Sequence, residues 1–225
     1  MKEYLKKRLT GTDIFLIAVN IVPVLGVWFD EWSATQAFFV YCLESVIVGL
    51  YNVLMMLIAT QFRKKDFWET GNGGGVMVSG YGFIVFFIVH YGFFVFLQMS
   101  IFLSTVGFKD APGVFDFVIH ARRYLPVQAQ WLLLLFIVSN GVLVLKGFML
   151  TGDYKTTSLS KLMFTPYVRV FVQQFCVILG SFFLTFGAGK IFILIFVCIK
   201  MFFEMLFDYD RMLNEKVMPS FKSGK

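Results

Sequence analysis

Six polar residues interrupt the long apolar stretches of this chain, and they carry the groups that could do chemistry inside a membrane. They are two carboxylates, an imidazole, an ammonium and two carboxamides: Glu44, Glu204, His90, Lys200, Asn140 and Gln174. A charge at the centre of a bilayer costs about 2.5–3.5 kcal/mol on insertion scales, so such residues usually have a structural or functional role. These side chains suit either a cluster that holds helices together or a site that binds an ion, a proton or a polar headgroup.

The spacing of these residues predicts a shared depth. With a rise of 1.5 Å per residue, Glu44, His90, Asn140 and Lys200 each reach the middle of their apolar stretch. Gln174 and Glu204 lie nearer the cytoplasmic end, and Lys200, Glu204 and Asp208 share one helix face because they are four residues apart. Lipid cannot satisfy polar groups, so we expect these side chains to form a polar midplane cluster. A lone Asn20 is expected only to bond to a neighbouring helix.

The same residues argue against metal or catalytic chemistry. Zinc needs three or four Cys, His or carboxylate ligands at one point, and only Glu44, His90 and Glu204 qualify. The sequence has no serine–base pair, zinc-protease motif, paired aspartates or nucleotide motif. The three cysteines lie inside apolar stretches and are interpreted as packing residues. The sequence therefore predicts no catalytic residue, no metal and no cofactor, and it leans against an enzyme.

The elements that position these residues are apolar helices. Hydrophobic residues make up 58% of the 225-residue chain, and 30 residues are Phe. Together with a mean hydropathy of +0.76, this excludes an ordinary soluble domain. We predict one all-α membrane domain over residues 1–225, a polytopic six-helix transmembrane bundle whose spans are residues 13–29, 34–60, 78–106, 127–150, 166–187 and 189–208.

Charge predicts the orientation of this bundle. Most Lys and Arg residues fall in the two termini and in the loops after spans two and four, so both termini are expected in the cytoplasm of a multi-pass cell-membrane protein. The same distribution explains the net charge of +6 without a nucleic-acid partner. The first apolar stretch resembles a signal peptide, but Asp30 and Glu31 follow it instead of a small-residue cleavage site, so we interpret it as a retained span.

Two connectors have patterns of their own. Residues 71–75 are glycine-rich and predict a flexible cytoplasmic turn; a phosphate-binding loop is the alternative, but no Lys-Ser or Lys-Thr follows at the required spacing. Residues 114–124, between spans three and four, alternate apolar with charged side chains. This pattern predicts a short amphipathic helix at the outer interface, with a lid over a cavity as the alternative.

Four short segments resemble an uncharacterised family of prokaryotic multi-pass integral membrane proteins, a domain of unknown function. They are residues 39–44, 90–94, 163–170 and 200–204. The resemblance implies that Glu44, His90, Lys200 and Glu204 match the family pattern. It also implies that typical members carry histidines, suited to an intramembrane metal centre, where this chain has Gln98, Asn140, Gln174 and Asp208. Carboxamides keep hydrogen bonding but bind metals poorly, so a metal centre is not expected in this chain.

Three classes of function remain open. The first is a non-catalytic subunit or interaction protein of a membrane complex, whose partners are the lipid bilayer and either another membrane protein or a second copy. The alternative is a small proton-linked transporter or ion-binding protein that uses the midplane cluster as a relay. The third is a membrane enzyme or metal-binding protein. The absence of visible repeats counts against a transporter, and the missing motifs count against an enzyme, so the first class is the prediction.

Overall fold

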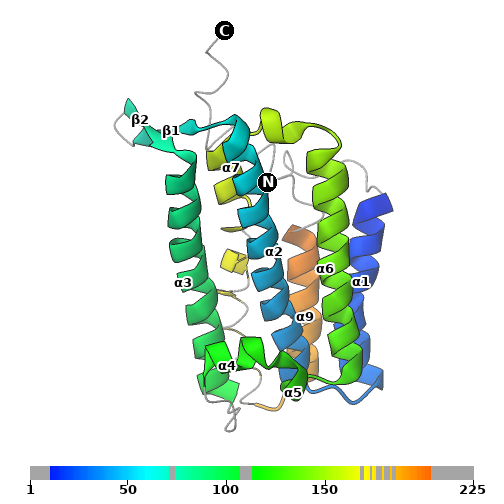
Figure 1. The fold of residues 1–225 in the computed structure, drawn as a ribbon. Coiled ribbons are helices and arrows are strands. Elements are labelled where there is room, and N and C mark those ends of the chain that lie inside the picture. Colours follow the sequence, from blue (N-terminus) through cyan, green and yellow to red (C-terminus); the bar gives the residue numbers. More distant parts are fainter. Residues whose placement is uncertain are drawn as a thin grey trace.

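Long helices dominate the computed structural model and stand side by side (Figure 1). The structure describes residues 11–70, 74–106, 113–167 and 186–203, and between the last two ranges residues 170–172, 174, 175, 179 and 183. The long helices are α1 (Gly11–Phe29), α2 (Ala34–Phe62), α3 (Gly80–Val106), α6 (Val127–Val144) and α9 (Gly189–Met201). The shorter elements are α4 (Val114–Ile119), α5 (Ala121–Tyr124), η2 (Leu145–Met149), η3 (Asp153–Lys155) and α7 (Leu159–Phe164).

Among the residues that the structure describes, three helices are long and apolar enough to cross a membrane. They are Ala34–Phe62, Gly80–Ser104 and Val127–Met149, and they coincide with predicted spans two, three and four. A shorter apolar helix, Ile17–Phe29, falls within the first predicted span. The fifth predicted span and the end of the sixth fall largely outside the described residues. The described part of the chain is thus mostly helical and contains three candidate membrane-spanning helices.

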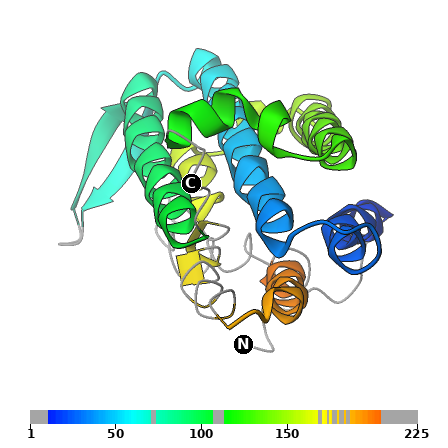
Figure 2. The same ribbon diagram turned by 90° about the horizontal axis from the view of Figure 1, so that it is seen from below.

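Helix α2 lies at the centre of the bundle. Ser33 starts it through a capping box: the Gln36 amide donates to the Ser33 hydroxyl at 3.0 Å, and the Ser33 amide donates to the Gln36 side chain at 3.0 Å. Residues 37–45 are all buried, because α1, α3, α6 and α9 pack around α2. Viewed from below, α2 lies between α3 and α6 (Figure 2). This central position explains why its polar side chains must find partners on other helices.

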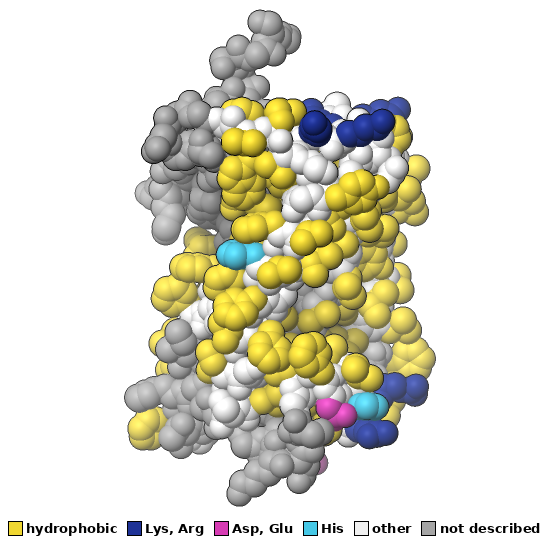
Figure 3. Space-filling model, turned by 60° about the vertical axis from the view of Figure 1, so that its left-hand side comes forward, with side chains coloured by type: hydrophobic (Ala, Val, Ile, Leu, Met, Phe, Trp, Pro, Cys, Tyr) yellow, Lys and Arg dark blue, Asp and Glu magenta, His cyan; other side chains and the backbone are white. Residues whose placement is uncertain are grey.

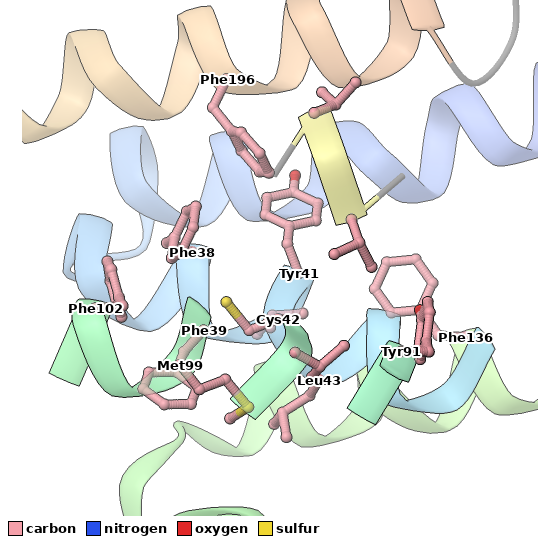
Figure 4. Close-up of a cluster of buried hydrophobic side chains, with 14 of the residues drawn as sticks. Phe38, Phe39, Tyr41, Cys42, Leu43, Tyr91, Met99, Phe102, Phe136 and Phe196 are labelled. Atoms are coloured by element: carbon pink, nitrogen blue, oxygen red, sulfur yellow. The ribbon is translucent and has the colours of Figure 1, made fainter. Parts of the chain in front are cut away.

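Aromatic side chains fill the space around α2. Phe38 packs against Phe102 of α3 at 4.3 Å between ring centroids and against Phe196 of α9 at 5.2 Å. Tyr41 reaches from α2 toward Phe196, with 4.9 Å between their ring centroids (Figure 4). Tilted and edge-to-face pairs of this kind contribute about 0.5–1.5 kcal/mol each beyond their area burial. The Phe-rich composition therefore forms a contiguous core between helices.

A β-hairpin joins α2 to α3 where the sequence predicted only a flexible turn. Strand β1 (Lys65–Thr70) pairs antiparallel with β2 (Gly74–Ser79). Buried Asp66 ties the hairpin to α7, because its carboxylate accepts a hydrogen bond of 2.6 Å from the Leu159 amide. The Ser160 hydroxyl adds a bond of 3.0 Å to the Phe67 carbonyl. These contacts fix the connector against the bundle.

The predicted helix between spans three and four consists of two short helices, α4 and α5, with a break at His120. Asp116 joins them, since its carboxylate lies 2.9 Å from the His120 imidazole and accepts a 2.9 Å bond from the Tyr124 hydroxyl. Phe117 anchors the pair in the core by packing on Phe39, with their ring centroids 3.5 Å apart. The two helices cross one end of α2 (Figure 2). Their placement at a membrane surface stays a prediction.

Candidate functional site

Glu44 and Lys200 form an ion pair in the middle of the bundle. The Lys200 ammonium lies 2.9 Å from the Glu44 carboxylate, and both side chains are only 2% exposed. The pair joins α2 to α9, which are far apart in sequence. Two buried charges cost more free energy than they gain unless their geometry is good and further hydrogen bonds satisfy them. The surroundings of the pair therefore decide what it can do.

Asn20 of α1 and Tyr41 of α2 supply those further bonds. The Lys200 ammonium donates a short hydrogen bond to the Asn20 side-chain oxygen. The Tyr41 hydroxyl donates to the Asn20 carbonyl at 2.6 Å, and the ammonium lies 5.1 Å from the centroid of the Tyr41 ring, within cation–π range. We call Asn20, Tyr41, Glu44 and Lys200 the ion-pair cluster. It ties together α1, α2 and α9.

Buried polar contacts continue on the side of α2 that faces α3. The Tyr91 hydroxyl donates a 2.9 Å bond to the Ser45 carbonyl. The Gln98 carboxamide lies 3.6 Å from the Cys42 sulfur. All four residues are buried. Polar groups on this side of α2 therefore also link helices.

His90 occupies a different place, on an exposed side of α3. Its Nδ1 lies 2.8 Å from the Tyr167 hydroxyl. The imidazole stacks on Phe86, with 5.0 Å between ring centroids and 16° between planes, and meets Phe94 edge-on at 5.0 Å. Within the described ranges, the Tyr167 hydroxyl is the one hydrogen-bond partner of this ring. The structure therefore separates His90 from the ion-pair cluster.

The remaining residues of the predicted midplane cluster lie elsewhere. Gln174 is next to the His90 site and donates to the Phe94 carbonyl at 3.0 Å. Asn140 bonds within its own helix, to the Phe136 carbonyl at 2.8 Å. Glu204, like Asp208, lies outside the described residues. Of the predicted cluster, the structure brings Glu44 and Lys200 together and places Gln174 beside His90.

Sequence reasoning underestimated Asn20 and Tyr41. Asn20 was expected to bond to a neighbouring helix, and its side chain does accept a hydrogen bond from Lys200 of α9, but the sequence did not place it with the ion pair. Its signal was a lone carboxamide in an apolar stretch, which says nothing about its partner. Tyr41 gave no signal, because a tyrosine in an aromatic-rich helix is ordinary.

Neither site has the composition of a metal centre. Among the residues that the structure describes, no group of three or more His, Cys, Asp or Glu side chains could hold a metal ion. Three grooves on this part of the chain have linings that include neither Glu44 nor Lys200. The ion-pair cluster is thus suited to holding helices together, whereas the His90 site offers an imidazole to whatever adjoins α3.

Comparison with known proteins gives a family but no activity. Neither the curated proteins nor the solved structures contain a match to this chain. Residues 4–220, nearly the whole sequence, match the model of a family of unknown function (DUF6498), and the chain therefore belongs to that family.

Proposed function

We propose that this protein is an integral membrane protein that crosses the bilayer six times with both termini in the cytoplasm, and that it serves as a non-catalytic subunit of a membrane complex. The observation that carries the proposal is the exposed His90 on a helix apolar enough to span a membrane. A polar group facing hydrocarbon without a partner is costly. A neighbouring membrane helix that hydrogen-bonds to the imidazole removes this cost.

The geometry around His90 favours such a contact. If the Tyr167 hydroxyl donates to Nδ1, the neutral imidazole carries its proton on Nε2, where it can donate to an incoming group. A groove of about 290 Å³ lies alongside and is lined by Phe94, Tyr167, Gln174 and two apolar neighbours. Interhelical hydrogen bonds in membranes contribute about 0.6 kcal/mol on average, so the surrounding aromatic packing must supply the rest of the affinity. The partner expected here presents a polar side chain amid apolar ones.

The ion-pair cluster supports a structural rather than a transport role. Its charges neutralise each other, and a third helix supplies a further acceptor. Its four side chains belong to residues that are at most 1% exposed, so neither charged group lies at a surface from which an ion or a proton could enter. The cluster therefore accounts for Glu44 and Lys200 without a transported ion.

The test is purification of the tagged protein from its native membranes in mild detergent. We expect a stoichiometric membrane-protein partner, or a second copy, that is retained by the wild type and lost in His90→Leu. Val138→Leu on α6, where Val138 is 53% exposed, is the matched control and should retain the partner. A lone chain in the wild type, or equal retention by His90→Leu, contradicts the proposal. Thermal unfolding of each variant checks that the fold is intact.

A further inference from the structure

A second exposed feature lies between α2 and α3 and does not include His90. It is a groove of about 640 Å³ whose lining residues are almost all apolar. Leu50 and Val53 line it from α2, and Val89 and Phe93 line it from α3. Leu50, Val89 and Phe93 are among the exposed apolar side chains. The groove therefore opens sideways, in the direction where a bilayer would surround the helices.

Two glycines shape this groove. Gly49 lets α2 approach α3, because a Cβ there would lie 2.6 Å from the Tyr91 ring. Gly92 has the opposite surroundings, since a Cβ there would meet no atom within 4 Å. Both glycines line the groove. The close approach at Gly49 forms its floor, and the missing side chain at Gly92 leaves it open.

Helix α4 closes one end of the groove. Phe115 of α4 packs on Phe96 of α3 at 5.6 Å, and Val114 and Val118 also line the cavity. Immediately beyond, α5 presents two exposed arginines. On this face of the molecule, basic side chains gather at both ends and apolar side chains cover the middle (Figure 3). The helix that closes the apolar groove is thus followed in the chain by two exposed arginines.

The charge at that end is not neutralised by the nearby carboxylate. Asp116 is held by the His120 imidazole and the Tyr124 hydroxyl, each at 2.9 Å. Neither Arg122 nor Arg123 forms an ion pair with any residue in the described ranges. Arginine binds phosphate oxygens in bidentate fashion, so these two guanidinium groups are suited to an anionic headgroup.

We propose that the groove binds one acyl chain of an anionic phospholipid, whose phosphate contacts Arg122 and Arg123. The volume lies within the range of small-ligand pockets and suits a flexible hydrocarbon chain better than a helix about 10 Å across. Bilayer tails are as apolar as the groove, so burial of the chain alone gives little selectivity. Discrimination between lipids therefore resides in the headgroup.

Native mass spectrometry of the purified full chain tests this proposal, with phosphatidylglycerol and phosphatidylcholine added at equal concentration. We expect the wild type to retain one phosphatidylglycerol and to retain phosphatidylcholine at least tenfold less. Gly92→Leu fills the groove without a clash and should lower phosphatidylglycerol retention at least fivefold. Gly147→Leu is the control. A Cβ at Gly147 also meets no atom within 4 Å, but Gly147 lines a different groove, between α1 and α6.

The headgroup contact has its own variant. Arg122→Gln with Arg123→Gln should bring the retention of the two lipids to the same low level. The proposal is overturned if Gly92→Leu retains phosphatidylglycerol like the wild type, if Gly147→Leu loses it equally, or if the arginine variant keeps its preference. It is also overturned if the wild-type chain copurifies with another protein that is lost in Gly92→Leu, because a protein would then occupy the groove. Unchanged melting temperatures of the variants show that the losses are not caused by unfolding.

Discussion

The ion-pair cluster and the His90 site place polar side chains in apolar helices but satisfy them in different ways. Glu44 and Lys200 meet each other across two helices and are almost wholly buried. His90 has a tyrosine hydroxyl at one ring nitrogen and packs on Phe86 and Phe94, yet the residue as a whole is exposed. The first arrangement is complete within the chain. In the proposed function a partner completes the second, so the comparison sets a role in folding against a proposed role in assembly.

The contrast is sharpest between two consecutive residues of α3. Tyr91 is 4% exposed and bonds to α2, whereas His90 is exposed and lies toward Tyr167. A helix with 3.6 residues per turn rotates by about 100° at each residue, so neighbours face different surroundings. One helix therefore contributes to the core and to the outer surface at the same depth.

The largest expected effect comes from removing one member of the ion pair. Glu44→Ala leaves the Lys200 ammonium buried without its carboxylate and should lower the free energy of unfolding by about 3–5 kcal/mol. Equilibrium unfolding in mixed micelles measures this loss. Glu44→Leu combined with Lys200→Met should recover most of it, because no charge is then left buried. A loss below about 1 kcal/mol in Glu44→Ala would show that the cluster does not hold the helices together.

The next largest effect is expected from comparing two glycines. Gly49 of α2 packs closely against the inner side of α3, whereas Gly92 lies on the open outer side of α3. Gly49→Ala should cost about 1–3 kcal/mol, because its Cβ would lie 2.6 Å from the Tyr91 ring. Gly92→Ala should be neutral or slightly stabilising, since its Cβ has space and alanine favours a helix. Equal unfolding free energies for the two variants would remove the distinction between the inner and outer sides.

A smaller effect is expected at the edge of the ion-pair cluster. Tyr41→Phe removes the 2.6 Å bond to the Asn20 carbonyl and should cost about 0.5–1.5 kcal/mol. Tyr81→Phe, at a residue that is 58% exposed, should leave the unfolding free energy unchanged. If both variants unfold alike, the Tyr41 hydroxyl makes no net contribution to stability.

The smallest effect on stability is expected at His90. His90→Leu should change the unfolding free energy by less than about 1 kcal/mol, because it removes a single exposed hydrogen bond and keeps apolar contacts. The same variant should lose the partner, which size-exclusion chromatography of the detergent-solubilised complex would reveal. A large loss of stability with the partner retained would make His90 a folding residue like Glu44.

The sequence predicted α2 and α3 well, as spans 34–60 and 78–106, because an apolar run of this length has few possible structures other than a long helix. It also predicted that Glu44 and Lys200 lie at similar depth. It could not predict rotation about the helix axis, since helices that are apolar all round have no stripe to indicate which side is buried. For that reason Glu44 and His90 were grouped together although the structure separates them. The β-hairpin was missed because its glycine-rich segment is typical of a turn.

The long separation in sequence between Lys200 and Asn20, 180 residues, has a consequence for biosynthesis. The chain is made from its N-terminus, so Asn20 and Glu44 are synthesised well before Lys200. During that interval the Glu44 carboxylate lacks its ammonium partner, so we expect the incomplete chain to be more open to proteolysis. We expect chains terminated before Lys200 to be degraded much faster than the full chain in pulse–chase labelling. Equal lifetimes would show that the missing Lys200 does not expose the chain to proteases.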